Sequence, residues 1–265
     1  MEKEKKFTKY ETMGSDYHYR QIEKNVFRFN SFVFSRYTQH VNVVKDYLKK
    51  KPGGDGGLKL LDVGCGDGVL LYLLKKTFGQ NIELFGIDSS EEAIMIARKQ
   101  IPEAHFICGD VYQIKFPENH FDIVVSSDVI EHVLYPKKML AEIQRVTKKN
   151  AFVSIGTPIR FTEYPIDLNH AHEFFQNEFT EIMKGSFGNC HLIETHPLLF
   201  SLLYKRAFPC FGKNIPLFKY VINILHIYLG INLFEPNKTL DSRSMSYMIA
   251  VSKKEEASQV CYEHI

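Results

Sequence analysis

The stretch LDVGCGDGVLLYLL, residues 61–74, restricts the fold of this chain more than any other part of the sequence. It places Gly64, Gly66 and Gly68 at alternate positions between two apolar runs. An apolar run, a glycine-rich turn and a second apolar run predict a buried strand, a tight loop and a helix. Backbone N–H groups of such a loop face a polar ligand at the helix N-terminus. The stretch therefore predicts a strand–loop–helix unit that binds a nucleotide-like molecule.

The alternation of apolar runs and amphipathic segments continues beyond this unit. Strands are predicted at 58–63, 82–88, 105–110, 121–128, 151–158, 190–196 and 244–254, and helices at 68–79, 89–100, 136–149 and 172–187. Strands that alternate with helices indicate βαβ units with right-handed crossovers. The expected fold class is α/β, a doubly wound, Rossmann-like sheet of seven mostly parallel strands. Ligands in such folds bind outside the carboxyl ends of the strands.

The same pattern divides the 265 residues into four parts. Residues 1–57 are predicted to form an N-terminal helical cap and linker, and 58–196 the core. An apolar helical insert or lid is expected at 197–243, and the last strand of the core with a disordered tail at 244–265. This length suits one large domain with an elaborated insert.

Charge and cysteine content narrow the class of protein. The 33 basic and 31 acidic residues give a net charge of only +2, which argues against a nucleic-acid partner. The five cysteines form no CxxC pair, so neither a disulfide framework nor a zinc site is expected. The charged N-terminus shows no apolar secretory segment. A cytoplasmic enzyme is the expectation.

Two common nucleotide loops do not fit the glycine pattern. Dinucleotide binding needs a glycine three places after Gly66, where Val69 stands, and no GK[ST] sequence follows as in a phosphate-binding P-loop. An acid does end the second predicted strand. Asp88 lies where a carboxylate can accept both hydrogens of a ribose diol.

Four successive segments then point to one family. LDVGCGDG, GIDSS, CGD and FDIVVSSDVIEH match its motifs in order, and across 58–160 the sequence resembles class I S-adenosylmethionine-dependent methyltransferases. DVIEHV, residues 128–133, is similar to the corresponding segment of quinone-biosynthesis O-methyltransferases. The resemblance implies S-adenosyl-L-methionine as cofactor and S-adenosyl-L-homocysteine as product.

The resemblance also implies which residues meet the cofactor. They are Asp62, Gly64, Cys65, Gly66, Gly68, Asp88, Ser89, Asp110, Val111, Ser127 and Asp128. Asp62 would orient the loop and the cofactor's amino group, while Asp88, with Ser89 beside it, would bind the ribose. Asp110 would lie near the adenine amino group with Val111 against the ring, and 127–128 at the methionine end. A helix-capping role for any of these acids stays open, and Cys65 reads as a small loop residue rather than a nucleophile.

Two histidines are the candidate catalytic residues. His132 follows the fourth strand and His170 lies in the polar segment YPIDLNHAHEFF, and a histidine is a natural proton acceptor near neutral pH. His132 could instead orient the next helix. Glu131, His132, Asp167 and His170 could also assemble a divalent-metal site, although no metal is predicted. An [ND]PP[YFW] motif is absent after the fourth strand, which argues against methylation of a base amine.

The expected function is methylation of a small-molecule acceptor, with oxygen as the favoured target and a quinone-like, polyketide-like or sugar metabolite as substrate. A lipid-linked or sugar acceptor at a membrane surface is one alternative, and a catalytically silent binding or scaffold protein of the same fold is another. Protein or nucleic-acid methylation is a further enzymatic alternative, which a partner-binding basic surface would favour.

The apolar insert leaves three roles open. Residues 215–234 are about as long as a membrane span but contain Lys219, Asn223 and His226, spaced as one polar stripe on a helix. A transmembrane helix is therefore not expected. A lid over the acceptor, a dimer contact and a peripheral membrane contact all remain, and with them a monomer or a homodimer.

Overall fold

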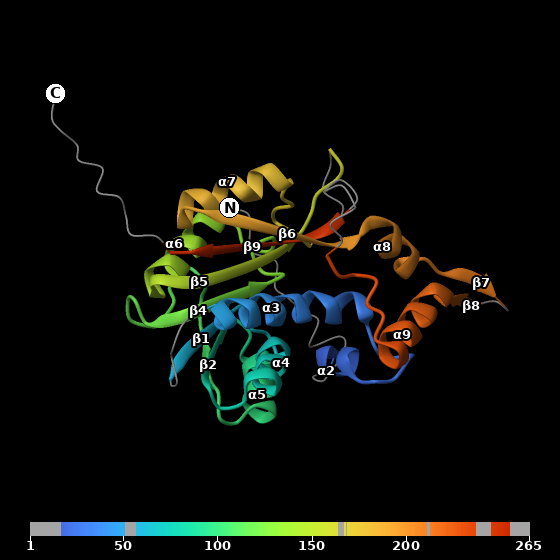
Figure 1. Ribbon diagram of the computed structural model, residues 1–265, viewed down its shortest axis with the longest axis horizontal. Coiled ribbons are helices and arrows are strands. Elements are labelled where there is room, and N and C mark those ends of the chain that lie inside the picture. The colour runs from blue at the N-terminus through green and yellow to red at the C-terminus, as the bar shows by residue number, and fades with distance from the viewer. Residues whose placement is uncertain are drawn as a thin grey trace.

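A computed structural model describes residues 17–50, 57–163, 167, 169–210, 213–236 and 245–254. The predicted loop at 51–56 and the predicted C-terminal tail beyond 254 lie outside these residues. The described chain is built around one large sheet, flanked by helices on both faces (Figure 1).

The sheet has seven strands in the order β3-β2-β1-β4-β5-β9-β6. Its strands are β1 (Leu58–Val63), β2 (Ile82–Asp88), β3 (His105–Cys108), β4 (Phe121–Ser127), β5 (Thr147–Pro158), β6 (Cys190–Pro197) and β9 (Met245–Lys253). The first five pair in parallel, and β9 pairs antiparallel with both β5 and β6. The predicted seven-stranded, mostly parallel sheet is confirmed.

Amphipathic helices cover both faces of this sheet. They are α2 (Tyr17–Ile22), α3 (Ser31–Lys50), α4 (Val69–Phe78), α5 (Glu91–Gln100), α6 (Pro136–Val146) and α7 (Gln176–Phe187). Buried side chains of α6 and α7 join the core on one face, and those of α3, α4 and α5 join the core on the other (Figure 1). The N-cap of α5 is Ser90, whose Oγ accepts from the Ala93 N–H, as the SSEE segment predicts.

One boundary differs from its prediction. The helix predicted at 136–149 ends at Val146, and β5 begins at the next residue. Val146 and Thr147 are fully buried, and Thr147 pairs with Phe121 at the start of β4. Two consecutive β-branched residues favour a strand, and pairing with β4 decides the boundary.

The apolar insert forms a separate arm, named here the insert arm, residues 198–234. It contains α8 (Leu198–Lys205), a two-stranded ribbon of β7 (Phe208–Cys210) and β8 (Lys213–Ile215), and α9 (Leu217–Leu229). In Figure 1 the arm projects from one end of the sheet, near α2. The ribbon has no counterpart in the sequence prediction. Within the described ranges, no helix combines the length and apolarity needed to cross a bilayer.

The strand order reverses direction between two neighbouring strands, β1 and β4. From β1 the chain continues to β2 and β3 on one side, and from β4 it continues to β5 on the other. The helices after β1 and β4 therefore diverge to opposite faces. Ligands of doubly wound folds bind at this switch point, outside the carboxyl ends of the strands.

Candidate active site

The glycine loop leaves β1 at this switch point. The backbone N–H groups of Gly64 and Cys65 both donate to the carbonyl oxygen of Ile87 on β2, at 2.8 and 3.0 Å. Gly64 has a φ of +75°, and a Cβ atom at this position would lie 2.3 Å from a methyl carbon of Val129. Only glycine satisfies both the left-handed backbone and the close approach.

A substitution at Gly64 should therefore destabilise the protein more than a substitution at another glycine whose backbone is left-handed. We expect Gly64→Ala to lower the free energy of unfolding by about 3 kcal/mol or more, from left-handed strain and overpacking together. Gly230 is the matched control, because its φ of +67° and ψ of +15° are left-handed and a Cβ there would meet nothing within 4 Å. Gly230→Ala should cost about 1–2 kcal/mol, the strain alone. Urea unfolding measures both, and equal losses would contradict the packing argument.

Asp88 fastens the loop to the second strand. Its Oδ2 accepts from the Gly66 N–H at 2.9 Å and its Oδ1 from the Ser90 N–H at 2.8 Å. Each carboxylate oxygen keeps a further lone pair, which fits the predicted binding of a ribose diol. Burial raises the pKa of Asp88, and the two backbone hydrogen bonds oppose that rise. Ser89, predicted beside it, is exposed.

Buried acids gather around the loop. Asp62 at the end of β1 is 2% exposed, and so is Asp67 within the loop. His18 of α2 donates to Asp67 Oδ2 at 3.0 Å, and Tyr19 donates to the Asp67 carbonyl at 3.3 Å. Asp67 and α2 are parts of the site that the sequence prediction missed.

The buried acid on β1 makes stability depend on pH. Burial, together with the Asp88 carboxylate, raises the pKa of Asp62 from 3.8 to about 8. Between about pH 4 and 8 the folded protein thus holds a proton that the unfolded chain has lost, so the free energy of unfolding falls as pH rises. We expect Asp62→Asn to remove a slope of about 1.4 kcal/mol per pH unit inside this window.

Urea unfolding at several pH values across the window measures that slope. Asp46→Asn is the control, because Asp46 lies on α3 and is exposed. An unchanged slope in Asp62→Asn would show that the carboxyl on β1 is ionised in the folded protein at neutral pH.

On the predicted adenine side, the structure shows a local turn. The exposed Asp110 accepts from the Tyr112 N–H at 2.8 Å, and Val111 packs partly buried against the core. Asp110 thus stabilises a turn, and no helix begins there for it to cap. The Cys65 thiol is buried, and burial raises its pKa well above the ordinary value, so it is not an activated nucleophile.

An arginine from the N-terminal cap reaches the end of β4. Asp128, with a φ of +57°, forms an ion pair with Arg36 of α3 and accepts from the Ser127 hydroxyl at 3.0 Å. The hydroxyl of Tyr247 on β9 donates to Asp128 at 3.3 Å. The Arg36 guanidinium lies over the rings of Phe32 and Tyr247, at 4.6 and 4.4 Å. Sequence gave no signal for Arg36 or Tyr247, which lie 92 and 119 residues from Asp128.

Two buried nitrogens beside this ion pair have unmet hydrogen-bonding capacity among the described residues. They are Arg36 Nε and His40 Nε2. Burial lowers the pKa of His40 to about 4, so its ring is neutral. A Cβ atom at Gly156 would lie 2.6 Å from His40 Nε2, so a glycine is needed there. An unpaired guanidinium N–H fits a carboxylate, which is the group the predicted methionine end would present.

The two predicted catalytic histidines lie together on the acceptor side. Their ring centroids are 5.0 Å apart. His170 Nδ1 donates to Glu173 Oε1 at 3.2 Å, and its Nε2 lies 3.7 Å from Asp167 Oδ2. His132 Nδ1 donates to the Asn169 carbonyl at 3.2 Å. Both rings are thus oriented by hydrogen bonds at Nδ1, and a histidine held in this way can accept a proton at Nε2.

Glu131 completes this cluster. It is 1% exposed, its Oε2 accepts from the Thr157 hydroxyl at 3.1 Å, and burial raises its pKa to about 8. One ligand atom each of Glu131, His132 and His170 lies within 4.8 Å of the others. Two imidazole nitrogens and one carboxylate oxygen suit a divalent transition metal better than magnesium.

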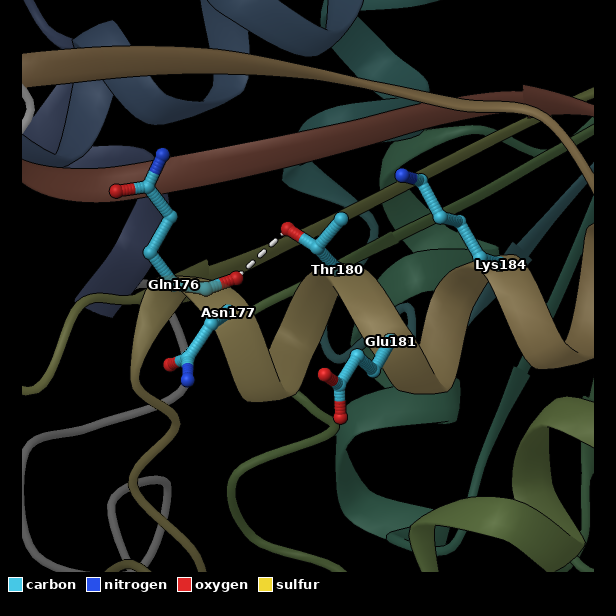
Figure 2. Close-up of a pocket in the computed structure, with 5 residues that line it drawn as sticks. All are labelled: Gln176, Asn177, Thr180, Glu181 and Lys184. Atoms are coloured by element: carbon cyan, nitrogen blue, oxygen red, sulfur yellow. Dashed lines mark hydrogen bonds between the residues drawn. The ribbon is translucent and has the colours of Figure 1, made fainter.

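The hollows on the surface lie elsewhere. Figure 2 shows one of about 370 Å³ along α7, where Thr180 donates to the Gln176 carbonyl. It is lined by none of the predicted site residues. His172 borders a second hollow, of about 730 Å³, and its exposed ring donates to the Leu134 carbonyl at 3.2 Å. His172 therefore lies outside the acceptor-side cluster.

Comparison with known proteins agrees with this geometry. Residues 61–155 match the family model described as a methyltransferase domain. A ubiquinone biosynthesis O-methyltransferase of Bradyrhizobium diazoefficiens is 33% identical over 106 residues, covering 38% of this chain and 40% of that protein. A probable S-adenosylmethionine-dependent methyltransferase of Mycolicibacterium smegmatis is 26% identical over 133 residues, covering 48% and 51%.

Solved structures share the whole fold. A SAM-dependent methyltransferase of Thermotoga maritima superposes with a TM-score of 0.58 at 18% identity, covering 93% of this chain and 98% of that one. The chain thus shares the doubly wound fold of that structure. Residues 61–155 match a methyltransferase domain, and the curated relatives that they resemble include S-adenosylmethionine-dependent methyltransferases. The matches span about a third to a half of the curated relatives' own lengths.

Proposed function

We propose that this protein transfers a methyl group from S-adenosylmethionine to an oxygen of a small-molecule acceptor. The observation that supports it most is the arrangement around β4. The Asp88-anchored glycine loop lies at the neighbouring strands β1 and β2, and the cluster of Glu131, His132 and His170 follows β4 itself. Both segments follow the carboxyl ends of neighbouring parallel strands, which is where ligands of such folds bind.

Each residue has a defined task in this proposal. The cofactor supplies an activated methyl group on a sulfonium. Asp88 holds the ribose, and Arg36, with its unpaired Nε, binds the carboxylate end. His170 accepts the acceptor's hydroxyl proton at Nε2, and Glu173 and Asp167 stabilise the imidazolium that results. Glu131 is buried beside the two half-buried histidines, and alignment of the acceptor against them would favour the transfer.

A metal-assisted form of the same reaction is the second candidate. The three ligand atoms of Glu131, His132 and His170 within 4.8 Å of one another favour it. A divalent ion there would lower the pKa of the acceptor hydroxyl. Dialysis against EDTA, followed by addition of Mn²⁺ or Zn²⁺, separates the two: loss and recovery of turnover support the metal, and unchanged turnover supports the histidine alone.

Methyl transfer to a panel of acceptors tests the proposal. The panel contains catechols, hydroquinones, hydroxylated polyketides and sugars, with S-adenosylmethionine labelled on the methyl group, and mass spectrometry locates the label. A methyl ether is expected. Label on nitrogen or carbon would overturn the oxygen assignment, and cofactor binding without transfer to any acceptor would favour the scaffold alternative.

We place the reaction in the cytosol, in keeping with the reduced cysteines expected there.

A further inference from the structure

Helix α9 of the insert arm exposes its apolar side. Leu217, Val221, Ile224 and Tyr228 recur at spacings of four, three and four residues, so they form one stripe along the helix. Their exposed fractions are 57, 45, 44 and 67%. Four large apolar side chains in one exposed row exceed the scattered exposure that is normal for a protein surface. The stripe is a candidate contact surface.

The opposite side of α9 is polar and buried, which fixes the rotation of the helix. Asn223 is fully buried: its amide donates to the carbonyls of Val26 and Phe29 at 2.8 and 2.7 Å, and its oxygen accepts from the Tyr204 hydroxyl at 2.9 Å. His226 hydrogen-bonds the Ser31 hydroxyl. Turning the apolar stripe inward would break these buried bonds, each costly to leave unmade. The protein therefore holds the stripe outward.

The charge of the insert arm indicates which partner covers the apolar stripe. Residues 195–234 contain Lys205, Arg206, Lys213 and Lys219 and not one Asp or Glu, while the rest of the chain carries a net charge of −2. Lys205 and Arg206 are exposed at the end of α8, which packs against α9, whereas Lys219 lies on the inward side of α9 over the Tyr204 ring. A second copy docked through the arm would bring two positively charged arms together, which disfavours a symmetric dimer. An anionic lipid surface complements both the cations and the apolar stripe.

We propose that the insert arm docks on the surface of an anionic phospholipid bilayer, with Leu217, Val221, Ile224 and Tyr228 at the boundary between headgroups and acyl chains. The inference is independent of the methyl-transfer proposal. The insert arm is also linked to the candidate site. Helix α9 is hydrogen-bonded to Ser31 at the start of α3, and Arg36 of α3 forms an ion pair with Asp128. Docking of the arm would thus fix the orientation of the candidate site relative to the bilayer.

Vesicle flotation of the full chain tests the proposal. One set of vesicles contains equal parts of phosphatidylcholine and phosphatidylglycerol, and the other phosphatidylcholine alone. We expect flotation with the anionic vesicles and at least about tenfold weaker partitioning into the neutral ones. The double variant Val221→Ser/Ile224→Ser should lose about tenfold or more with anionic vesicles, because its apolar contact is reduced. Arg206→Gln, which removes an exposed cation, should lose about fivefold.

The matched control is Met95→Ser on α5, which removes an equally exposed apolar side chain, 60% exposed, from outside the arm. It should float like the unmodified chain, and thermal unfolding should be the same for all variants, since each changed side chain is exposed. Absence of flotation with anionic vesicles overturns the proposal. So does equal flotation of the double variant, or a dimer in sedimentation analysis that the double variant abolishes.

Discussion

Replacing Asp88 with alanine is expected to weaken the binding of S-adenosylhomocysteine at least about a hundredfold. The substitution removes the carboxylate proposed to accept both ribose hydroxyls. It also releases the Gly66 and Ser90 N–H groups that this carboxylate accepts, at 2.9 and 2.8 Å, so the glycine loop loses its anchor to β2. Isothermal calorimetry measures the affinity directly and needs no acceptor.

Asp110→Ala is the matched control for this experiment. Asp110 is exposed and its carboxylate accepts from the Tyr112 N–H, so its main task in the structure is to hold a turn. We expect a loss of about tenfold or less. Unchanged affinity in Asp88→Ala, with the fold intact by circular dichroism, would refute the ribose assignment. A larger loss in Asp110→Ala than in Asp88→Ala would move the main cofactor contact to β3.

Replacing His170 with alanine is expected to lower kcat by at least about a hundredfold while leaving the affinity for S-adenosylhomocysteine unchanged. His170 is the histidine best placed to hold a transferred proton, because carboxylates lie near both ring nitrogens: Glu173 at 3.2 Å and Asp167 at 3.7 Å. The Nδ1 of His132 donates to a backbone carbonyl and not to a carboxylate, so His132→Ala should have the smaller effect on kcat. Turnover with an acceptor found in the panel measures the difference.

His172→Ala is the control here, since His172 is exposed, lies two residues away and does not join the cluster. Its turnover should stay near that of the unmodified enzyme. Near-normal rates in both His132→Ala and His170→Ala would show that proximity alone, or Glu131, supports catalysis. A parallel loss of S-adenosylhomocysteine affinity in His170→Ala would instead assign this residue to the cofactor-binding part of the candidate site.

Much of the fold could be predicted because its signals are local. Apolar runs such as 58–63 and 82–88 coincide with β1 and β2, and Ser90 and Gly79 mark the start of α5 and the end of α4. The boundary at Val146 was missed because the last turn of a helix and the first residues of a buried strand look alike until the partner strand is known.

The candidate site was predictable where its residues sit in one loop or at one strand end. Asp88 and Gly66 belong to consecutive motifs, and parallel strands bring their carboxyl ends together. Arg36 and Tyr247 come from α3 and β9, and nothing in their local sequence distinguishes them from other residues of a helix and a strand. Only packing of the N-terminal cap and the last strand against β4 places them beside Asp128.

The glycine loop shows what the sequence determined by itself. Val69 excludes a dinucleotide loop and the missing GK[ST] excludes a P-loop, because each of these constraints acts within one βαβ unit. The resemblance of the glycine loop, Asp88, Asp110 and DVIEH to successive methyltransferase motifs implies the methyl-donor site. Helix α9 shows what only the tertiary structure decided. Its sequence defines a polar stripe at Lys219, Asn223 and His226, but solvent would be the ordinary partner of such a stripe. Buried backbone carbonyls of the N-terminal segment bind Asn223 instead, so the apolar side of the helix faces outward.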